Sequence, residues 1–569
     1  MLSPTYLFVL LLPALCGATP MRRSMQVHEA RADLPSGYTL TGPASPQTVL
    51  TLRLALAQNN ITGLVDTLYD VSTPSSANYG AYLSKEKIEE YIAPTEESSS
   101  AVNAWLTEND LQSTSLSAAG DWISVQMPAS TANNLFNADF SVFTHSSTGA
   151  QVVRTLAYSV PTDLAGHIDL VYPTVSFPSP VADVPQAATS LSAPQLTADN
   201  NTDPCNISLI TPACLQWLYD IPTTPATSPN NSMAVPGYAT EWPQEAYLKS
   251  FLEQYRPDID PDTTWELVTL DGGSDPQGSN STSVEGNLDM QWTIGLATNV
   301  TVKFISVSNV TIPDGDEFAE YLIDTATYML GLDSPPTVMP TSYGVNEESV
   351  SEKLAQKLCS SYAALGARGV SVLFGSGDGG VSGIQYETCT TFVPTFPGVC
   401  PYLTSVGGTW LVPETAANFS GGGFSNVFDR PSYQEDAVAG YLDYLGDTNS
   451  GLYNASGRAY PDVAAYSVHF DVIYGGAQGP INGTSCAGPT FASVISLLND
   501  KLIAAGRPVL GFLNPWLYSS ASSALTDITV GDNYACSGST TGFNATTGWD
   551  AVTGLGTPNY TKLKAVLDL

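Results

Sequence analysis

Basic side chains are scarce in this 569-residue chain, which has 19 Lys and Arg against 54 Asp and Glu. The formal net charge of −35 at pH 7 repels polyanions, so nucleic acid and anionic membranes are excluded as partners. At about pH 4 to 5 many carboxylates are partly protonated, and their mutual repulsion falls. The composition therefore suits a protein that works in acid.

Histidine is also rare, and the four in the sequence are His28, His145, His167 and His469. The first three precede residues 181–202, a candidate site of processing. If the chain is cut there, the C-terminal part retains only His469. The residues around His469 alternate in the manner of a strand, so a surface position is expected for it. A Ser-His-Asp triad is therefore poorly supported, and a different group has to accept the proton of any nucleophile.

Long apolar runs are nearly absent. Residues 6–12 form one, and the small residues Cys16-Gly17-Ala18 follow it, which predicts a secretory signal over residues 1–18 although no Lys or Arg precedes the run. The run is too short to span a bilayer, and no later stretch qualifies as transmembrane. We expect a secreted protein without stable membrane insertion, and twelve Asn-x-Ser/Thr sequons fit a glycoprotein.

Cysteine is present in modest number, with eight in all and Cys16 in the expected signal. The remaining seven cannot all pair, and Cys486 is the candidate free thiol because its neighbour Ser485 is the candidate nucleophile. The other six allow many pairings. Cys205 and Cys214 are near enough in sequence for a small local loop.

The length exceeds what one hydrophobic core usually organises, so at least two folded domains are expected. Residues 19–180 mix strand and helix patterns without regular alternation, which predicts an α+β domain of antiparallel type. Residues 181–202 are rich in Pro, Ala, Ser, Thr and Asn and form a candidate exposed linker, open to cleavage. Residues 203–569 alternate apolar strands with helices, which predicts a mostly parallel sheet with helices on both faces.

Hydrophobic periodicity places the individual elements. Strands are expected at 49–56, 122–128, 156–161, 302–307, 337–344 and 369–375. Helices are expected at 61–69, 85–92, 101–106, 247–254, 284–296, 318–330 and 349–365. In a parallel sheet of this kind, working residues lie beyond the carboxyl ends of the strands.

Ser485 is the candidate nucleophile. It lies in the turn Asn482-Gly483-Thr484-Ser485 and precedes the apolar run 490–498, which places it at a helix N-terminus. The free N–H groups and the positive dipole end there favour a developing alkoxide or oxyanion. The alternative is a common helix-capping turn without chemistry. The choice between a nucleophile and a capping turn depends on whether the chain offers a base that could activate the serine.

Glu285 and Asp289 are spaced i, i+4, which puts both carboxyl groups on one face of a helix. Two acids at this spacing repel each other, so helix stability does not explain them. A solvated helix face is the alternative interpretation. The apolar neighbours Leu288, Met290 and Trp292 favour a helix that packs into the body of the protein.

Asp378 follows an apolar strand and has glycines on both sides, so its backbone can approach a ligand closely. An aspartate that merely forms the turn is the alternative.

Taken together, four stretches resemble the sedolisin family, the serine-carboxyl peptidases with a subtilisin-like fold. They are the Glu-x-x-x-Asp helix, Ser376-Gly377-Asp378-Gly379, Pro461-Asp462-Val463-Ala464-Ala465 and Gly483-Thr484-Ser485-x-Ala487-x-Pro489. The text Asn78-Tyr79-Gly80-x-Tyr82-Leu83 resembles the family's activation propeptide, so the resemblance covers about residues 35–569. It is strongest to the fungal and lysosomal tripeptidyl-peptidase branch.

The resemblance implies a role for each of four residues: Ser485 is the nucleophile, Glu285 its general base, Asp289 the acid that orients and shares protons with Glu285, and Asp378 the oxyanion stabiliser. At about pH 4 an imidazole is protonated and cannot act as a base, whereas a glutamate is still partly ionised. Asp378 has to be protonated to donate a hydrogen bond to the oxyanion. Activity is expected to peak roughly between pH 3 and 5.

The C-terminal segment offers hard oxygen ligands of the kind that Ca²⁺ prefers. The resemblance implies one structural calcium ion, held by the carboxylates of Asp527 and Asp550 and by the carbonyl oxygens of Ile528, Thr546 and Gly548. Family members commonly have glycine where this chain has Thr546. The backbone carbonyl at this position can still bind the ion if threonine can adopt the required backbone angles.

The resemblance further implies a monomeric zymogen that acts on proteins and peptides, with its own propeptide as an intramolecular inhibitor. Release of tripeptides from protein N-termini is the expected activity, and an acid endopeptidase of the same family is the alternative. A catalytically silent secreted binding protein is less favoured, because the four residues with implied roles are all intact.

Overall fold

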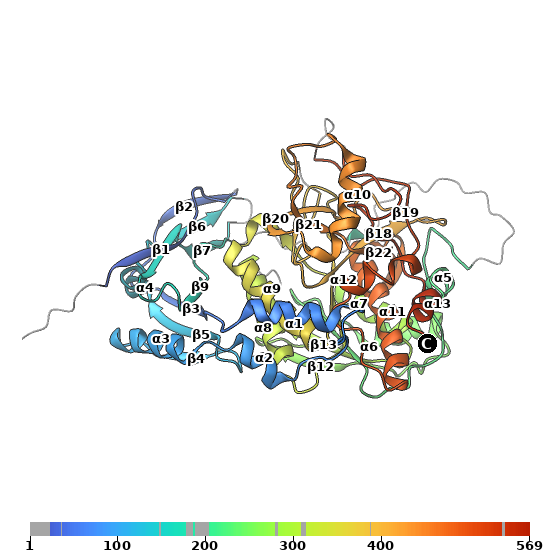
Figure 1. Ribbon diagram of the computed structural model, residues 1–569, viewed down its shortest axis with the longest axis horizontal. Coiled ribbons are helices and arrows are strands. Elements are labelled where there is room, and N and C mark those ends of the chain that lie inside the picture. The colour runs from blue at the N-terminus through green and yellow to red at the C-terminus, as the bar shows by residue number, and fades with distance from the viewer. Residues whose placement is uncertain are drawn as a thin grey trace, which may run out of the picture.

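Two bodies lie side by side in the computed structural model, an N-terminal one coloured blue to cyan and a larger one coloured green to red (Figure 1). The structure describes residues 23–35, 37–146, 149–177, 186–187, 204–278, 283–308, 315–386, 388–536 and 541–569. The expected signal at 1–18 lies outside the described residues, and so does most of the expected linker at 181–202.

Antiparallel sheets build the N-terminal body. β3 (Val49–Leu56) lies between β5 (Trp122–Pro128) and β9 (Ile168–Tyr172), and β4 (Ser113–Ser115) pairs with β5. The remaining strands are β1 (Met25–Ala30) paired with β8 (Ala157–Pro161), and the sheet of β2 (Tyr38–Pro43), β6 (Ser141–His145) and β7 (Gln151–Arg154). The helices are α1 (Ile61–Ser72), α2 (Lys85–Ile92), α3 (Glu96–Glu108) and α4 (Ala129–Phe136). The expected antiparallel α+β domain is confirmed.

Local sequence accounts for these elements. Alternate residues of β3, among them Leu52 and Leu54, enter a core to which α3 contributes Trp105 and α4 contributes Phe136. The helices α1, α2 and α3 each begin after a side chain that accepts a backbone N–H of the first turn, respectively Asn60, Ser84 and Thr95. The N-terminal body therefore has a core of its own.

A largely parallel sheet forms the centre of the larger body. Its strand order is β12-β13-β11-β14-β16-β18, with β22 parallel to β18 and the short β19 antiparallel to β18. Its strands are β11 (Ser232–Gly237), β12 (Glu266–Leu270), β13 (Thr301–Val307), β14 (Val338–Thr341), β16 (Ser371–Gly375), β18 (Thr404–Trp410), β19 (Thr415–Ala416) and β22 (Val463–Tyr466). The doubly wound sheet expected from the sequence is confirmed.

Helices cover both faces of this sheet. Phe304 of β13 packs in the cluster that includes α7 (Glu285–Leu296) and α11 (Thr484–Ala504). The next residue, Ile305, packs in the cluster of α8 (Gly315–Gly331) and α9 (Glu352–Ala367). Because neighbouring residues enter different cores, the strands are apolar nearly throughout rather than alternating.

Shorter elements complete the larger body. The helices are α5 (Pro212–Leu218), α6 (Glu245–Tyr255), α10 (Glu435–Leu445), α12 (Asn514–Leu517) and α13 (Tyr560–Val566), with 3₁₀ turns at Glu347–Ser349, Ser432–Gln434 and Ser522–Ala524. The strands are β15 (Val345–Asn346), β17 (Thr395–Phe396), β20 (Gly423–Asp429), β21 (Gly457–Tyr460), β23 (Phe470–Tyr474) and β24 (Ala477–Asn482).

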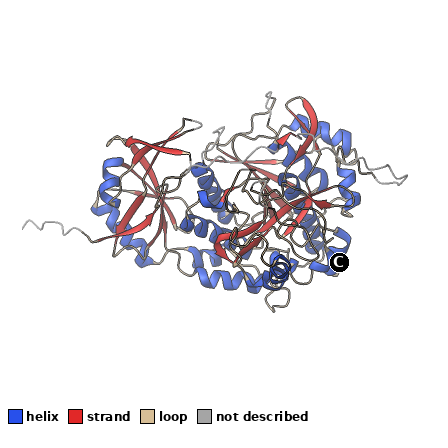
Figure 2. Cartoon of the chain, turned by 90° about the horizontal axis from the view of Figure 1, so that it is seen from above, coloured by secondary structure: helices blue, strands red, loops and turns tan. Residues whose placement is uncertain are grey.

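The N-terminal body docks on α8 and α9, and Figure 2 shows helices between the sheets of the two bodies. Ala55 and Trp122 of its four-stranded sheet join the cluster of α8 and α9. Leu68 of α1 packs in a second cluster with Ala364 of α9 and with Phe512. The contact therefore includes apolar packing from both a sheet face and a helix.

Residues 78–83, which carry the propeptide resemblance, contact the larger body. The hydroxyl of Tyr82 donates to the carbonyl of Val509 at 2.9 Å, and the N–H of Leu83 donates to the carbonyl of Ala367 at 2.8 Å. A Cβ on Gly511, whose φ is +63°, would lie 2.4 Å from the Tyr82 hydroxyl oxygen, so glycine is required there. This stretch is thus a docking segment.

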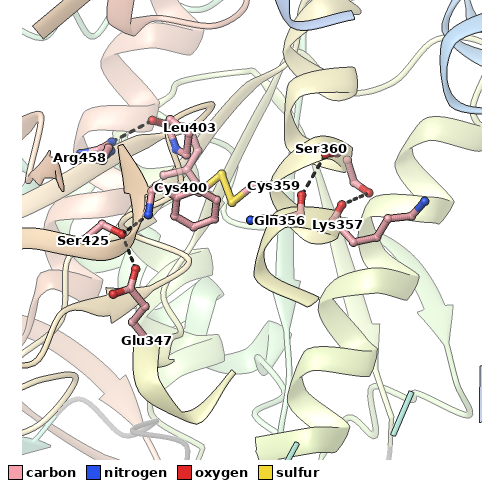
Figure 3. Close-up of a disulfide and its surroundings, with 12 residues drawn as sticks. Glu347, Gln356, Lys357, Cys359, Ser360, Cys400, Leu403, Ser425 and Arg458 are labelled. Carbon is pink, nitrogen blue, oxygen red and sulfur yellow. Dashed lines mark hydrogen bonds between the residues drawn. A yellow bond between two sulfur atoms is a disulfide. The ribbon is translucent and has the colours of Figure 1, made fainter. Parts of the chain in front are cut away.

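Three disulfides lie in the larger body: Cys205–Cys214, Cys359–Cys400 and Cys389–Cys536. The first closes the small loop that sequence spacing suggested. Figure 3 shows the second, which joins α9 to the segment before β18, with Glu347 and Ser425 nearby. Among the described residues Cys486 is the free cysteine, as expected.

The linker is represented in the structure by β10 (Gln186–Ala187). It pairs antiparallel with β24, Gln186 opposite Asn482 and Ala187 opposite Ile481. These two residues therefore lie beside the strand that leads to Ser485. No helix in the described ranges is long and apolar enough to cross a membrane.

Candidate active site

Ser485 lies in the first turn of α11, whose N-cap is Gly483. The φ of Gly483 is +152°, and a Cβ there would lie 2.9 Å from Asp378 Oδ2, so glycine is required in this turn. Ser485 is 7% exposed, and its Oγ donates to the carbonyl of Ser342 at 3.4 Å. The helix N-terminus thus presents a hydroxyl beside its N–H groups and positive dipole end.

The acid pair lies on α7, which is buried along its whole length. Glu285 is 1% exposed and Asp289 is 2% exposed. Gln291 fixes the helix to β23, because its side chain donates to the carbonyl of Ile473 at 2.7 Å and accepts the N–H of the same residue at 3.0 Å. The solvated-face interpretation is therefore excluded.

Burial raises the pKa of both acids. For Glu285 burial is the largest cause and the charge of Asp289 the next, whereas interaction with Ser485 opposes the rise. For Asp289 burial again dominates, and the hydrogen bond from Ser342 and the nearby carboxyl of Glu285 oppose the rise. Neither carboxylate oxygen of Glu285 has a regular hydrogen-bond partner among the described residues. The two acids titrate as a unit, and the pair becomes a base once its first proton is lost.

Asp378 lies in the loop after β16, beyond the carboxyl end of that strand. Its Oδ1 accepts hydrogen bonds from the backbone N of Thr484 at 2.7 Å and from the Thr484 hydroxyl at 3.0 Å. Burial raises the pKa of Asp378 to about 6, and the bonds from Thr484 oppose the rise. The side chain therefore reaches across to α11, beside Ser485, and is neutral in acid, when it can donate a hydrogen bond.

Comparison with known proteins covers the whole chain. Residues 36–177 match the family described as Pro-kumamolisin, activation domain. The chain is 36% identical to tripeptidyl-peptidase SED2 of Arthroderma otae, over 98% of this chain and 99% of the relative. It is 37% identical to tripeptidyl-peptidase SED3 of the same organism, over 96% of each. The chain belongs to the sedolisin family.

Within the sedolisin family, these relatives assign the chain to the tripeptidyl-peptidase branch, and it is a serine-type peptidase. Pseudomonas sedolisin (serine-carboxyl proteinase), solved with two molecules of pseudo-iodotyrostatin, shares the fold with a TM-score of 0.51 and 22% identity, over 64% of this chain and 99% of that one. Because an activation domain precedes the peptidase fold, the chain is a zymogen. The domain limits 19–180 and 203–569 stay predictions.

Glu241 belongs to this sedolisin site and was missed by sequence reasoning. Its Oε2 accepts hydrogen bonds from the Ser283 hydroxyl at 2.7 Å and from the backbone N of Val284 and Glu285 at 2.8 and 3.0 Å. It therefore holds the N-terminus of α7, where a carboxylate is favoured. The available signal was its place just beyond the carboxyl end of β11.

His469 is 7% exposed, so the surface position expected for it is wrong. Its Nδ1 is 2.6 Å from the carbonyl oxygen of Ile207, and its backbone N donates to Asn482 Oδ1 at 2.7 Å. It fixes the turn between β22 and β23. The Cys486 thiol is fully buried, and burial raises its pKa well above the usual range, so it stays protonated and is no nucleophile.

The residues expected to hold calcium lie together in the C-terminal segment. Asp550 Oδ2 accepts the N–H of Thr546 at 3.0 Å, and Asp527 Oδ2 accepts the N–H of Gly548 at 2.9 Å, so both carboxylates contact one loop. No described residue donates a hydrogen bond to the carbonyl oxygen of Ile528, Thr546 or Gly548. Burial raises the pKa of Asp550 to about 7.

This donor set fits Ca²⁺, which prefers carboxylate and carbonyl oxygens. A cation there would favour the ionised form of the buried Asp550. Gly548 has a φ of +86°, whereas Thr546 is not among the residues with positive φ, so threonine is tolerated at 546. The described residues contain no cluster of three or more His, Cys, Asp or Glu suited to a metal. A cation at this loop would depend on backbone carbonyls as well as the two carboxylates.

Proposed function

We propose that this zymogen matures into a secreted, acid-active serine-carboxyl peptidase that removes tripeptides from the N-termini of proteins and peptides. The observation that carries the proposal is the meeting of Ser485 with the Glu285–Asp289 pair and with Asp378. The names of the relatives, which are tripeptidyl-peptidases, support the release of tripeptides.

In the proposed reaction the Ser485 oxygen attacks the substrate carbonyl carbon while its proton passes to Glu285. In the singly ionised pair the proton that Glu285 already holds passes to Asp289 as Glu285 takes that of Ser485, and it returns when the amine leaves. Neutral Asp378 donates a hydrogen bond to the oxyanion. The C–N bond then breaks, the amine leaves with the proton from Glu285, and the acyl group stays on Ser485. Water attacks this ester by the same sequence and frees the serine.

The helix N-terminus explains why the nucleophile lies where it does. The N–H groups and the positive end of α11 stabilise the negative charge that develops on the oxyanion. A carboxyl pair that has lost one proton acts as a base in acid, when a histidine base would be protonated.

We also infer one structural Ca²⁺, bound by the carboxylates of Asp527 and Asp550 and by the carbonyl oxygens of Ile528, Thr546 and Gly548. When bound, the ion supplies positive charge that stabilises this loop. The apolar run at 6–12, the sequons and the disulfides favour a secreted glycoprotein, and we expect a monomer whose linker within about residues 178–203 is cut by its own Ser485.

Product analysis tests the proposal. Mass spectrometry of a denatured protein digested at about pH 4 should show successive tripeptides from the N-terminus. Internal fragments would favour the acid endopeptidase, and no cleavage at all would favour the silent binding protein. As the matched control, a Ser485→Ala zymogen purified free of other proteases should neither digest the substrate nor shorten itself in acid. Self-shortening of this variant would overturn the assignment of the nucleophile.

A further inference from the structure

Ser342 contacts both the acid pair and the nucleophile. It follows β14 at the carboxyl end of a central strand and is 8% exposed. Its Oγ donates to Asp289 Oδ1 at 2.8 Å, and its carbonyl oxygen accepts from Ser485 Oγ at 3.4 Å. Two different groups of one residue thus join α7 to α11.

The backbone of Ser342 is well fixed. β14 pairs in parallel with β11 on one side and with β16 on the other, and α11 packs against it. The Ser342 hydroxyl has a single proton. It lies 2.8 Å from Asp289 Oδ1 but 3.5 Å from the carbonyl oxygen of Ser485, so the bond to Asp289 is the stronger one.

We propose that Ser342 is a positioning residue whose hydroxyl holds the negative charge of the acid pair on Asp289 and so sets the pH at which the pair becomes a base. The inference rests on the proposed function, in which Glu285 accepts the proton of Ser485. A hydroxyl that donates to a carboxylate stabilises its ionised form. The direction of the effect on the pKa of Asp289, a lowering, agrees with this.

The other ionisable groups near Asp289 act in the opposite sense when they carry charge. They are Glu285 on α7, Glu241 after β11, Tyr343 beside Ser342 and Cys486 on α11. Asp378 adds its charge to Glu285. The hydrogen bond that favours ionised Asp289 comes from Ser342, and a protonated Glu285 acts in the same sense. Loss of the Ser342 hydroxyl therefore makes the first proton of the pair harder to remove.

The test is the pH dependence of kcat for processed Ser342→Ala enzyme on a peptide substrate. The rising acid limb should move up by about one pH unit, since a charge-assisted hydrogen bond is lost. The rate should recover towards that of the wild type above the shifted limb, because Ser485 and Glu285 are intact. Ser342→Thr keeps a hydroxyl and should restore the limb.

Thr341 provides a matched control on the same strand. It is 1% exposed, and its Oγ1 has no hydrogen-bond partner among the described residues, so Thr341→Val removes a buried hydroxyl of no electrostatic consequence. The acid limb of this variant should stay in place. If Ser342→Ala fails to fold, Ser342→Cys keeps the volume with a weak donor and should shift the limb in the same direction.

An acid limb that does not move in Ser342→Ala, or a loss of rate by the same factor at every pH, would overturn the inference. Failure of the proposed function looks different: the wild type would lack activity in acid, or Glu285→Gln would keep full activity. The two failures are therefore distinguishable in one set of profiles.

Discussion

Four carboxyl groups belong to this site or to its support: Glu285, Asp289 and Asp378, and Glu241 at the N-terminus of α7. Among the described residues, no lysine, arginine or histidine hydrogen-bonds to any of them. The partners of Glu241, Asp289 and Asp378 are hydroxyl and backbone N–H groups, and Glu285 has no regular partner. Burial and mutual repulsion disfavour the charged forms, so protons bind readily. The function proposed for this site therefore needs an acidic medium, in which these carboxyl groups keep protons.

Asp378 gives the prediction at the residue scale. Its pKa is raised to about 6, so the hydrogen bond that we propose it donates should be lost as the pH rises through that value, and the rate should fall. Asp378→Asn keeps a donor without a titratable proton, so this variant should retain some activity and its alkaline limb should move upward. Asp378→Ala should lower kcat by about 10² to 10³. Rate profiles from about pH 3 to 8 measure both. Full activity in Asp378→Ala would contradict the assignment.

The N-terminal ends of two helices, α7 and α11, hold the catalytic candidates close together. The acid pair depends on the N-terminal turn of α7, which Glu241 caps, and Ser485 depends on the N-terminal turn of α11, which needs Gly483. The C-terminal loop around Gly548 depends on Asp527 and Asp550 in the same way. Each element end therefore has its own test.

The calcium loop gives a prediction at the scale of an element. Asp527→Ala or Asp550→Ala should remove the stabilisation by added Ca²⁺, which amounts to about 2.7 kcal/mol when the ion is a hundredfold above Kd. Thermal melting with calcium and with chelator measures it. Asp532→Ala removes an exposed carboxylate of the same segment and should leave the calcium response unchanged. Melting of the wild type that is the same in chelator would refute the site.

The docked propeptide gives a second prediction at this scale. Arg53 of β3 is 10% exposed and pairs with Asp324 at 2.6 Å and with Glu320, both on α8. Burial raises the pKa of Glu320, so acid neutralises this carboxylate and weakens the contact. Arg53→Met should weaken docking by about 1 kcal/mol or more, which lowers the ratio of docked to open propeptide by about fivefold or more. Processing should therefore start at a higher pH.

Gel analysis of self-processing at a series of pH values measures this effect. Arg23→Met is the matched control, because Arg23 pairs with Glu108 and Asp163 inside the N-terminal body. Processing of Arg53→Met at the same pH as the wild type would show that the pair does not hold the propeptide.

At the scale of the whole molecule, buried acids link stability to pH. The pKa of Asp378 is raised to about 6 and that of Asp550 to about 7, above the unfolded value of about 3.9. The folded state therefore binds more protons than the unfolded chain between these values. The stability that these two carboxyl groups contribute is complete below about pH 4 and is lost as the pH rises through 6 and 7.

The free energy of unfolding of a Ser485→Ala zymogen in chelator should be lower at about pH 7.5 than at about pH 4.5, by about 2 kcal/mol or more. Urea unfolding measures it without self-digestion. The double variant Asp378→Asn with Asp550→Asn should flatten the dependence. Greater stability at the higher pH would contradict the sign of these pKa shifts.

The sequence by itself determined a subset of the helices and strands, and the catalytic candidates. Periodicity found β3 at 49–56 and α2 at 85–92 with the limits that the structure has, and α9 within three residues at each end. The spacing of Glu285 and Asp289 and the glycine before Thr484 are local, so they can be recognised within one helical turn. For the same reason the loop Cys205–Cys214 was found.

Only the tertiary structure decided which side chains are buried together. The burial of Glu285 and Asp289, the hydrogen bond from Ser342 to Asp289, and the burial of His469 all depend on contacts between segments far apart in the chain. The pairings Cys359–Cys400 and Cys389–Cys536 and the docking of β3 on α8 depend on them as well. Local sequence fixes backbone conformation, whereas burial and proton affinity follow from what the folded chain packs against each group.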